Sequence, residues 1–160
     1  MAIGRCELAS GTNGGNSASG GYIQRKFATW EGETWFVSGF DGTMGPGGTT
    51  DQFDLDPGTY KVSGTSTAYK SNGAYTLMDS TDNQIQIWGT NARGGNTTEA
   101  QLNCPFEGTF TITEKKTFKI WTFTVTTLST YGLGVENGTS TGVPAARVEN
   151  YGNVIIEKLK

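Results

Sequence analysis

Residues 53–62 read FDLDPGTYKV, and this stretch decides the fold class of the chain. Apolar residues stand at every second position on either side of a Pro57-Gly58 pair, which predicts a strand, a tight turn and a second strand. Pro57 fixes the φ angle that the turn needs, and Gly58 tolerates the conformation that follows. We expect Tyr60 to be buried and the second strand to run on to residue 69. The stretch therefore predicts a β-hairpin that leads into a long strand.

The rest of the chain has the composition of an all-β domain. Its 160 residues are enough for one domain with a hydrophobic core, and 24 of them are glycine. Segments with strand character follow one another at short intervals and are separated by turn signals such as Ser-Asn-Gly at 71–73. No segment has a helical period of apolar residues. This pattern predicts a β-sandwich or a β-barrel.

A Gly-, Ser- and Asn-rich stretch at 10–21 predicts a boundary near the N-terminus. We expect residues 1–21 to form an extended arm and link, and residues 22–160 to form the folded domain. An arm this short cannot fold alone, so it is expected to lie on another chain. Its candidate contact residues are Ile3, Cys6 and Leu8. A chain without residues 1–20 is then expected to fold and to form its oligomer. It is not expected to attach to the partner on which the arm lies.

The strand at 118–125 is apolar on both faces. Phe118 and Ile120 point one way, whereas Trp121 and Phe123 point the other way. A sheet with one solvated face alternates apolar and polar residues, so two apolar faces indicate that one packs on the core and the other on a neighbouring chain. A loop that covers the second face is the alternative. The candidates for contact between chains are Tyr60, Phe118, Ile120 and Ile156.

Charge and residue types exclude several classes of function. The net charge is −3 and the basic residues do not cluster, so no nucleic-acid partner is expected. No apolar run is long enough for insertion into a membrane. The chain has no histidine, which excludes the usual Ser-His and Cys-His nucleophiles, and we expect no catalytic residue, metal site or cofactor.

A few polar groups leave alternatives open. The carboxylate pairs Glu31/Glu33 and Asp54/Asp56 could serve a glycosidase, but they are expected to be solvated strand edges. Residues 79–83, DSTDN, could ligate calcium, although Asp and Asn equally suit a turn. Cys6 and Cys104 are expected to be buried or half-buried thiols, because a disulfide would need an oxidising compartment.

The aromatic residues carry the strongest signal for binding. Most of the tryptophans and tyrosines lie in predicted strands, where they usually belong to the core. Three that lie near loops, Tyr69, Tyr75 and Trp88, could instead form a platform on which sugar rings stack.

With these motifs, the chain resembles the trimeric jelly rolls of the tumour necrosis factor and complement-head type, and more closely those of bacteriophage fibre heads and capsid decoration proteins. The matching positions are Phe53, Leu55, Pro57, Gly58 and Tyr60, the hairpin expected between strands 108–112 and 116–120, and the closing segment 154–158. The resemblance implies a β-sandwich of about ten strands, a homotrimer and no enzymatic activity.

The leading function that the resemblance implies is that of a virion structural protein. Such a protein would be a trimeric cement or decoration protein that binds the outer surface of the capsid. Its partners would be its own copies and the major capsid protein, and it would be assembled in the host cytoplasm and displayed on the virion surface. The alternative is a phage receptor-binding fibre head or a carbohydrate-binding module, whose partner is a glycan on the host surface. An exposed row of aromatic residues would favour the alternative, whereas an arm ordered on a neighbour would favour the structural role.

Overall fold

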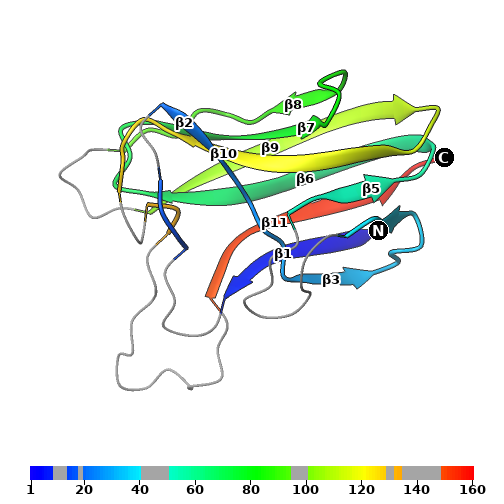
Figure 1. The fold of residues 1–160 in the computed structure, drawn as a ribbon, viewed down its shortest axis with the longest axis horizontal. Coiled ribbons are helices and arrows are strands. Elements are labelled where there is room, and N and C mark those ends of the chain that lie inside the picture. The colour runs from blue at the N-terminus through cyan, green and yellow to red at the C-terminus, as the bar shows by residue number, and fades with distance from the viewer. Residues whose placement is uncertain (9–13, 18–19, 41–50, 95–100, 129–131, 135–148) are drawn as a thin grey trace.

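The computed structural model describes residues 1–8, 14–17, 20–40, 51–94, 101–128, 132–134 and 149–160 (Figure 1). Every regular element in these ranges is a β-strand, and ten of the strands form two antiparallel sheets of five strands each. Buried residues of both sheets meet in one hydrophobic core. The predicted all-β sandwich is therefore confirmed.

We call the two sheets the β6 sheet and the β10 sheet. In spatial order the β6 sheet consists of β3 (Thr29–Gly32), β1 (Ala2–Leu8), β11 (Glu149–Lys158), β6 (Gly58–Tyr69) and β9 (Gln101–Ile112). The β10 sheet consists of β4 (Val37–Ser38), β5 (Phe53–Leu55), β10 (Lys116–Thr124), β7 (Ala74–Ser80) and β8 (Gln86–Trp88).

The strand pairs are nested along the chain. β1 pairs with β11, β5 with β10, β6 with β9, and β7 with β8, so that each pair encloses the next. Successive pairs alternate between the β6 sheet and the β10 sheet. The chain thus runs as one long antiparallel ribbon folded around the core, which is the path that Figure 1 shows.

The stretch 53–62 forms a corner between the sheets. β5 pairs with β10 in one sheet, whereas β6 pairs with β9 and β11 in the other, so the predicted hairpin is wrong although its turn and both strands exist. The hydroxyl of Tyr60 donates to the carbonyl oxygen of Asp56 at 2.6 Å and holds the corner. A Cβ at Gly58 would lie 2.7 Å from the carbonyl oxygen of Lys160, so this close approach requires glycine. The expected hairpin between 108–112 and 116–120 is a second such corner, because β9 and β10 lie in different sheets.

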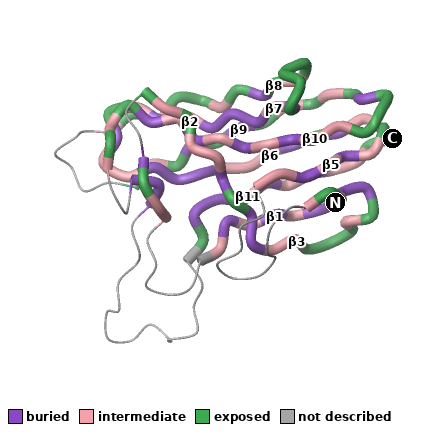
Figure 2. Tube along the Cα trace, viewed as in Figure 1, coloured by how far each residue is buried: buried purple, intermediate pink, exposed green. Residues whose placement is uncertain are grey.

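The core lies between the sheets and includes all four residues that we expected at a trimer contact. Tyr60, Phe118, Ile120 and Ile156 are at most 1% exposed within a single chain. Figure 2 shows buried stretches, in purple, on strands of both sheets. That part of the prediction is wrong, because side chains enclosed by their own chain cannot reach another. The burial predicted for Tyr60 is confirmed. The strand at 118–125 does have two apolar faces. Phe118 and Ile120 face the core, whereas Trp121 and Phe123 form the outer face.

The first residues of the chain belong to the sandwich. β1 lies between β3 and β11, and Ala2 and Cys6 point into the core. The expected arm is therefore wrong for residues 2–8, and Cys6 is enclosed by its own chain. Ile3 is half-buried on the outer side, and Leu8 pairs with Glu149 through the backbone. The glycine-rich stretch suggested a domain boundary, but it is a connection between two strands of one domain. Its residues 10–13 and 18–19 lie outside the described residues.

The segment that follows closes one side of the sandwich. β2 (Gly21–Gln24) lies beside β10, and the amide of Arg25 donates to the carbonyl oxygen of Ile120 at 2.7 Å. Three residues later the amide of Ala28 donates to the carbonyl oxygen of Arg5, on β1, at 2.8 Å. The segment 20–28 therefore passes from the β10 sheet to the β6 sheet and places the Arg25 side chain between them.

The turn after β7 gives a prediction for acid stability. The Asp82 carboxylate accepts hydrogen bonds from the Lys116 ammonium at 2.5 Å and the Ser80 hydroxyl at 2.5 Å, and these lower its pKa to about 2. A carboxyl whose pKa is lower in the folded chain stabilises the fold above its pKa in the unfolded chain. This contribution is lost as the pH falls through about 2. Carbon NMR titration of Asp82 should show this midpoint, and Lys116→Gln should move it upward. Lys115→Gln, which removes a partner of Asp54 instead, should leave it unchanged.

Candidate binding face on the β10 sheet

The outer face of the β10 sheet carries a set of large aromatic side chains. Alternate residues of a strand point to opposite faces, and the core-facing residues are Thr76, Met78 and Ser80 on β7 and Phe118, Ile120 and Thr122 on β10. The intervening residues therefore point outward. The outward-facing residues are Tyr75, Leu77 and Asp79 on β7, Lys119, Trp121 and Phe123 on β10, and Gln86 and Trp88 on β8.

The register of the strands arranges these residues in rows. Trp121 lies opposite Leu77, which in turn lies opposite Trp88. The next row along pairs Phe123 with Tyr75, and the row on the other side runs from Lys119 through Asp79 to Gln86. Cross-strand neighbours on one face lie close enough to contact each other. An aromatic area thus borders a polar one on the same surface.

Tyr75 stands at the centre of the aromatic area. Its ring stacks on Phe123 with 4.9 Å between centroids, and it lies 5.7 Å from the ring of Trp88. Tyr22, from β2, covers one side with its ring 5.3 Å from Phe123. The hydroxyl groups of Tyr22 and Tyr75 are 2.5 Å apart and share a hydrogen bond. Burial and this bond raise the pKa of Tyr75 to about 12, so the phenol is neutral at physiological pH.

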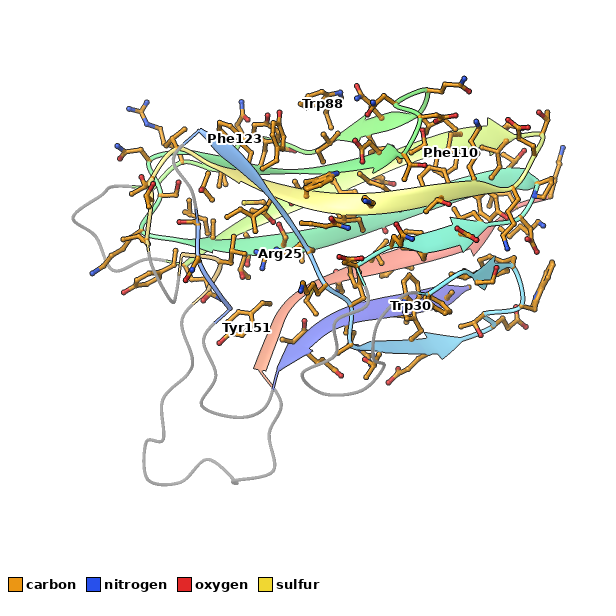
Figure 3. All side chains as sticks on the ribbon, in the orientation of Figure 1. Arg25, Trp30, Trp88, Phe110, Phe123 and Tyr151 are labelled. Atoms are coloured by element: carbon orange, nitrogen blue, oxygen red, sulfur yellow. The ribbon has the colours of Figure 1, made fainter. Side chains whose placement is uncertain are left out.

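A groove of about 370 Å³ lies between the aromatic and the polar rows. Trp121 and Trp88 line it, and Trp88 is 55% exposed. The indole N–H of Trp121 donates to Oδ1 of Asp79 at 2.8 Å, which fixes the ring and the carboxylate. Burial of the carboxyl group raises the pKa of Asp79 above its usual value. The Gln86 amide lines the same groove. Figure 3 labels Trp88 and Phe123 on the β8 and β10 side of the molecule.

The structure brings together two of the three residues of the predicted sugar platform. Tyr75 and Trp88 share this face, whereas Tyr69 ends β6 in the other sheet, with its ring 5.4 Å from the Lys70 ammonium. Sequence reasoning counted Trp121 among the strand aromatics that usually belong to the core, and it did not name Phe123 as a member. Their alternation with Phe118 and Ile120 separated the two faces of the strand but did not tell which one was the core.

The other polar candidates lie in ordinary surface contacts. Glu31 pairs with Arg5 at 2.5 Å, and Asp54 accepts a bond from Thr117 at 2.7 Å. Cys6 and Cys104 are free and buried, as expected. Within the described ranges no three His, Cys, Asp or Glu residues come together to hold a metal ion. The same part of the chain contains no helix with the length and apolar character needed to cross a membrane.

No protein-family model matches the chain, and no curated protein matches it in sequence.

Proposed function

We propose that the protein is a non-catalytic jelly-roll module that binds carbohydrate on the outer face of its β10 sheet. The observation that carries this proposal is the groove beside Trp88 and Trp121, with Asp79 held at one wall. Exposed indole rings offer flat apolar surfaces on which the carbon–hydrogen faces of a sugar can stack. The Asp79 carboxylate and the Gln86 amide offer acceptors and a donor for hydroxyl groups.

The nested strand pairs support the jelly-roll part of the proposal. A jelly roll is a double-sheet sandwich of antiparallel strands linked as Greek keys. Two sheets of five strands also fit the sandwich of about ten strands implied by the resemblance to bacteriophage fibre heads and capsid decoration proteins. From that resemblance we propose a homotrimer on the virion surface, assembled in the host cytoplasm, that acts as a receptor-binding head. Its ligand would be a neutral glycan on the host surface, because Asp79 would repel an acidic one.

A second candidate is the capsid cement or decoration protein, and the same surface favours it. Contiguous exposed apolar patches also mark contacts between proteins. In this case Trp88, Trp121 and Phe123 would rest on the major capsid protein or on another copy of the chain. Attachment would then use the face of the β10 sheet, because residues 2–8 are a strand of the sandwich.

The two candidates are separated by the ligand whose binding depends on Trp88, a neutral glycan or the phage particle. We expect Trp88→Ala to weaken binding to immobilised neutral polysaccharides by at least about fivefold. Losing an aromatic contact costs about 1–3 kcal/mol, and 1.4 kcal/mol is a factor of ten. The melting temperature should change little, since the side chain is largely exposed. Affinity electrophoresis or a glycan array gives the measurement.

Trp35→Ala is the matched control. Trp35 is 69% exposed, but it packs on Phe36 and Lys158 away from the groove, so glycan binding should persist. A wild-type protein that retains no neutral glycan would contradict the carbohydrate proposal. If it instead coats empty phage particles and Trp88→Ala prevents this, the decoration function takes its place.

A further inference from the structure

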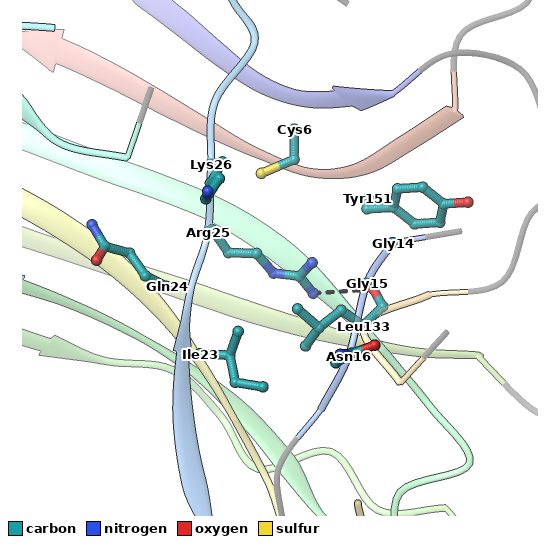
Figure 4. Close-up of a pocket in the computed structure, with 10 residues that line it drawn as sticks. All are labelled: Cys6, Gly14, Gly15, Asn16, Ile23, Gln24, Arg25, Lys26, Leu133 and Tyr151. Atoms are coloured by element: carbon teal, nitrogen blue, oxygen red, sulfur yellow. Dashed lines mark hydrogen bonds between the residues drawn. The ribbon is translucent and has the colours of Figure 1, made fainter. Parts of the chain in front are cut away.

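A second cavity lies where the segment 20–28 closes the sandwich (Figure 4). Its volume is about 470 Å³. The side chains that matter here are those of Ile23, Arg25, Lys26, Leu133 and Tyr151. This cavity is separate from the groove of the proposed glycan face, and none of the lining residues belongs to both.

Arg25 is held rigidly at the wall of this cavity. It is 3% exposed, and its Nε donates to the hydroxyl of Thr122 at 2.7 Å. Its Nη2 donates to the carbonyl oxygens of Thr67 and of Leu133, the latter at 3.2 Å. Thr122 is in turn bonded to Ser66 at 2.8 Å, so the guanidinium is anchored to a polar network between the sheets. All the acceptors are neutral.

The positive charge of Arg25 has no negative partner in the described part of the chain. Burial lowers its pKa, and the titratable groups that oppose this effect are the thiols of Cys6 and Cys104. Burial raises the pKa of both thiols to about 11, so they are neutral at pH 7. A buried charge without a counter-charge is costly. Among the described residues Nη1 makes no hydrogen bond, although a guanidinium has five N–H donors to place.

The remaining lining indicates what kind of anion fits. Lys26 adds a second positive charge to the rim, whereas Ile23, Leu133 and the ring of Tyr151 are apolar. A carboxylate meets a guanidinium through strong charge-assisted hydrogen bonds, and an apolar wall favours a ligand with a hydrocarbon or ring body. We propose that this cavity binds a small organic carboxylate, with its oxygens on Arg25 and its body against Ile23, Leu133 and Tyr151.

Calorimetry on the full-length protein tests the proposal with benzoate and its neutral analogue benzamide. Benzoate is expected to bind with a dissociation constant of about 1 mM or tighter, and benzamide at least about tenfold more weakly. Benzoate should also shift the Nε resonance of Arg25 in nitrogen NMR spectra. Equal binding of the two compounds, no binding of benzoate, or equally tight binding of inorganic sulfate would overturn the assignment.

Substitutions around the cavity test where benzoate binds. Arg25→Gln removes the proposed contact, but it also breaks the bonds to Thr67 and Leu133 and could unfold the chain. We therefore add Ile23→Trp, which fills the cavity from a half-buried position, and Lys26→Gln at the exposed rim. Ile23→Trp should abolish benzoate binding, and Lys26→Gln should weaken it severalfold. Lys61→Gln, an exposed lysine on β6, should have no effect. Unchanged affinity in Ile23→Trp would place the ligand elsewhere and refute the site.

Discussion

A chain that lacks residues 1–8 is expected to lose its cooperative fold. β1 lies inside the β6 sheet, so its removal breaks the ladders to both β3 and β11 and uncovers the part of the core that Ala2 and Cys6 close. The total stability of a domain is only about 5–15 kcal/mol, and loss of an internal strand exceeds what such a fold can absorb. Thermal melting followed by near-ultraviolet circular dichroism should show no transition.

Two substitutions on the outer face of the same strand provide the control. Ile3→Ser and Arg5→Ser change side chains that are half-buried and point away from the core, and the ladder remains intact. Both variants should melt within a few degrees of the wild type. A truncated protein that melts like the wild type would instead show that residues 1–8 are a dispensable arm.

Tyr60→Ala is expected to destabilise the protein by about 3–5 kcal/mol, the usual cost of truncating a large aromatic residue in a core. Tyr60 is fully buried, and its ring packs against Phe36 and Phe110 at centroid distances of 5.9 and 5.8 Å. The alanine would leave a cavity where the corner at 56–58 joins the two sheets. Urea unfolding followed by tryptophan fluorescence gives the free energy of unfolding.

Tyr60→Phe separates packing from hydrogen bonding at the same position. It keeps the ring and removes only the bond to the Asp56 carbonyl oxygen, so the expected loss is about 1–2 kcal/mol. If the phenylalanine variant lost as much as the alanine variant, the hydroxyl and not the ring would be the main contribution of Tyr60.

The fold class could be predicted because it depends on local signals. Short alternating strands and Gly-, Asn- and Pro-containing turns gave the all-β sandwich without any knowledge of which strands pair. Which strands pair with each other could not be predicted from such local signals. A Pro-Gly turn such as 57–58 looks the same whether it joins two strands of one sheet or carries the chain to another sheet. β9 runs unbroken through Pro105 and Gly108, because an edge strand tolerates a residue that cannot donate to the ladder.

The candidate site was predictable only in part, for a related reason. Trp88 and Tyr75 were identified by their nearness to turns. Trp121 was not, because β10 is apolar on both faces and periodicity alone is symmetric between core and surface. The Arg25 cavity gave no signal in the sequence at all. It forms from residues at 6, 23–26, 133 and 151, which only the tertiary structure brings together.

The nested order of the strands has a consequence for how the protein is made. Ala2 pairs with Ile156, so a ladder inside the β6 sheet joins positions that lie 154 residues apart along the chain (156 − 2). Contacts between such distant positions carry a large entropy of loop closure and slow the search for the native state. On the ribosome, β1 has to wait for β11 while its backbone groups stay open to other partners.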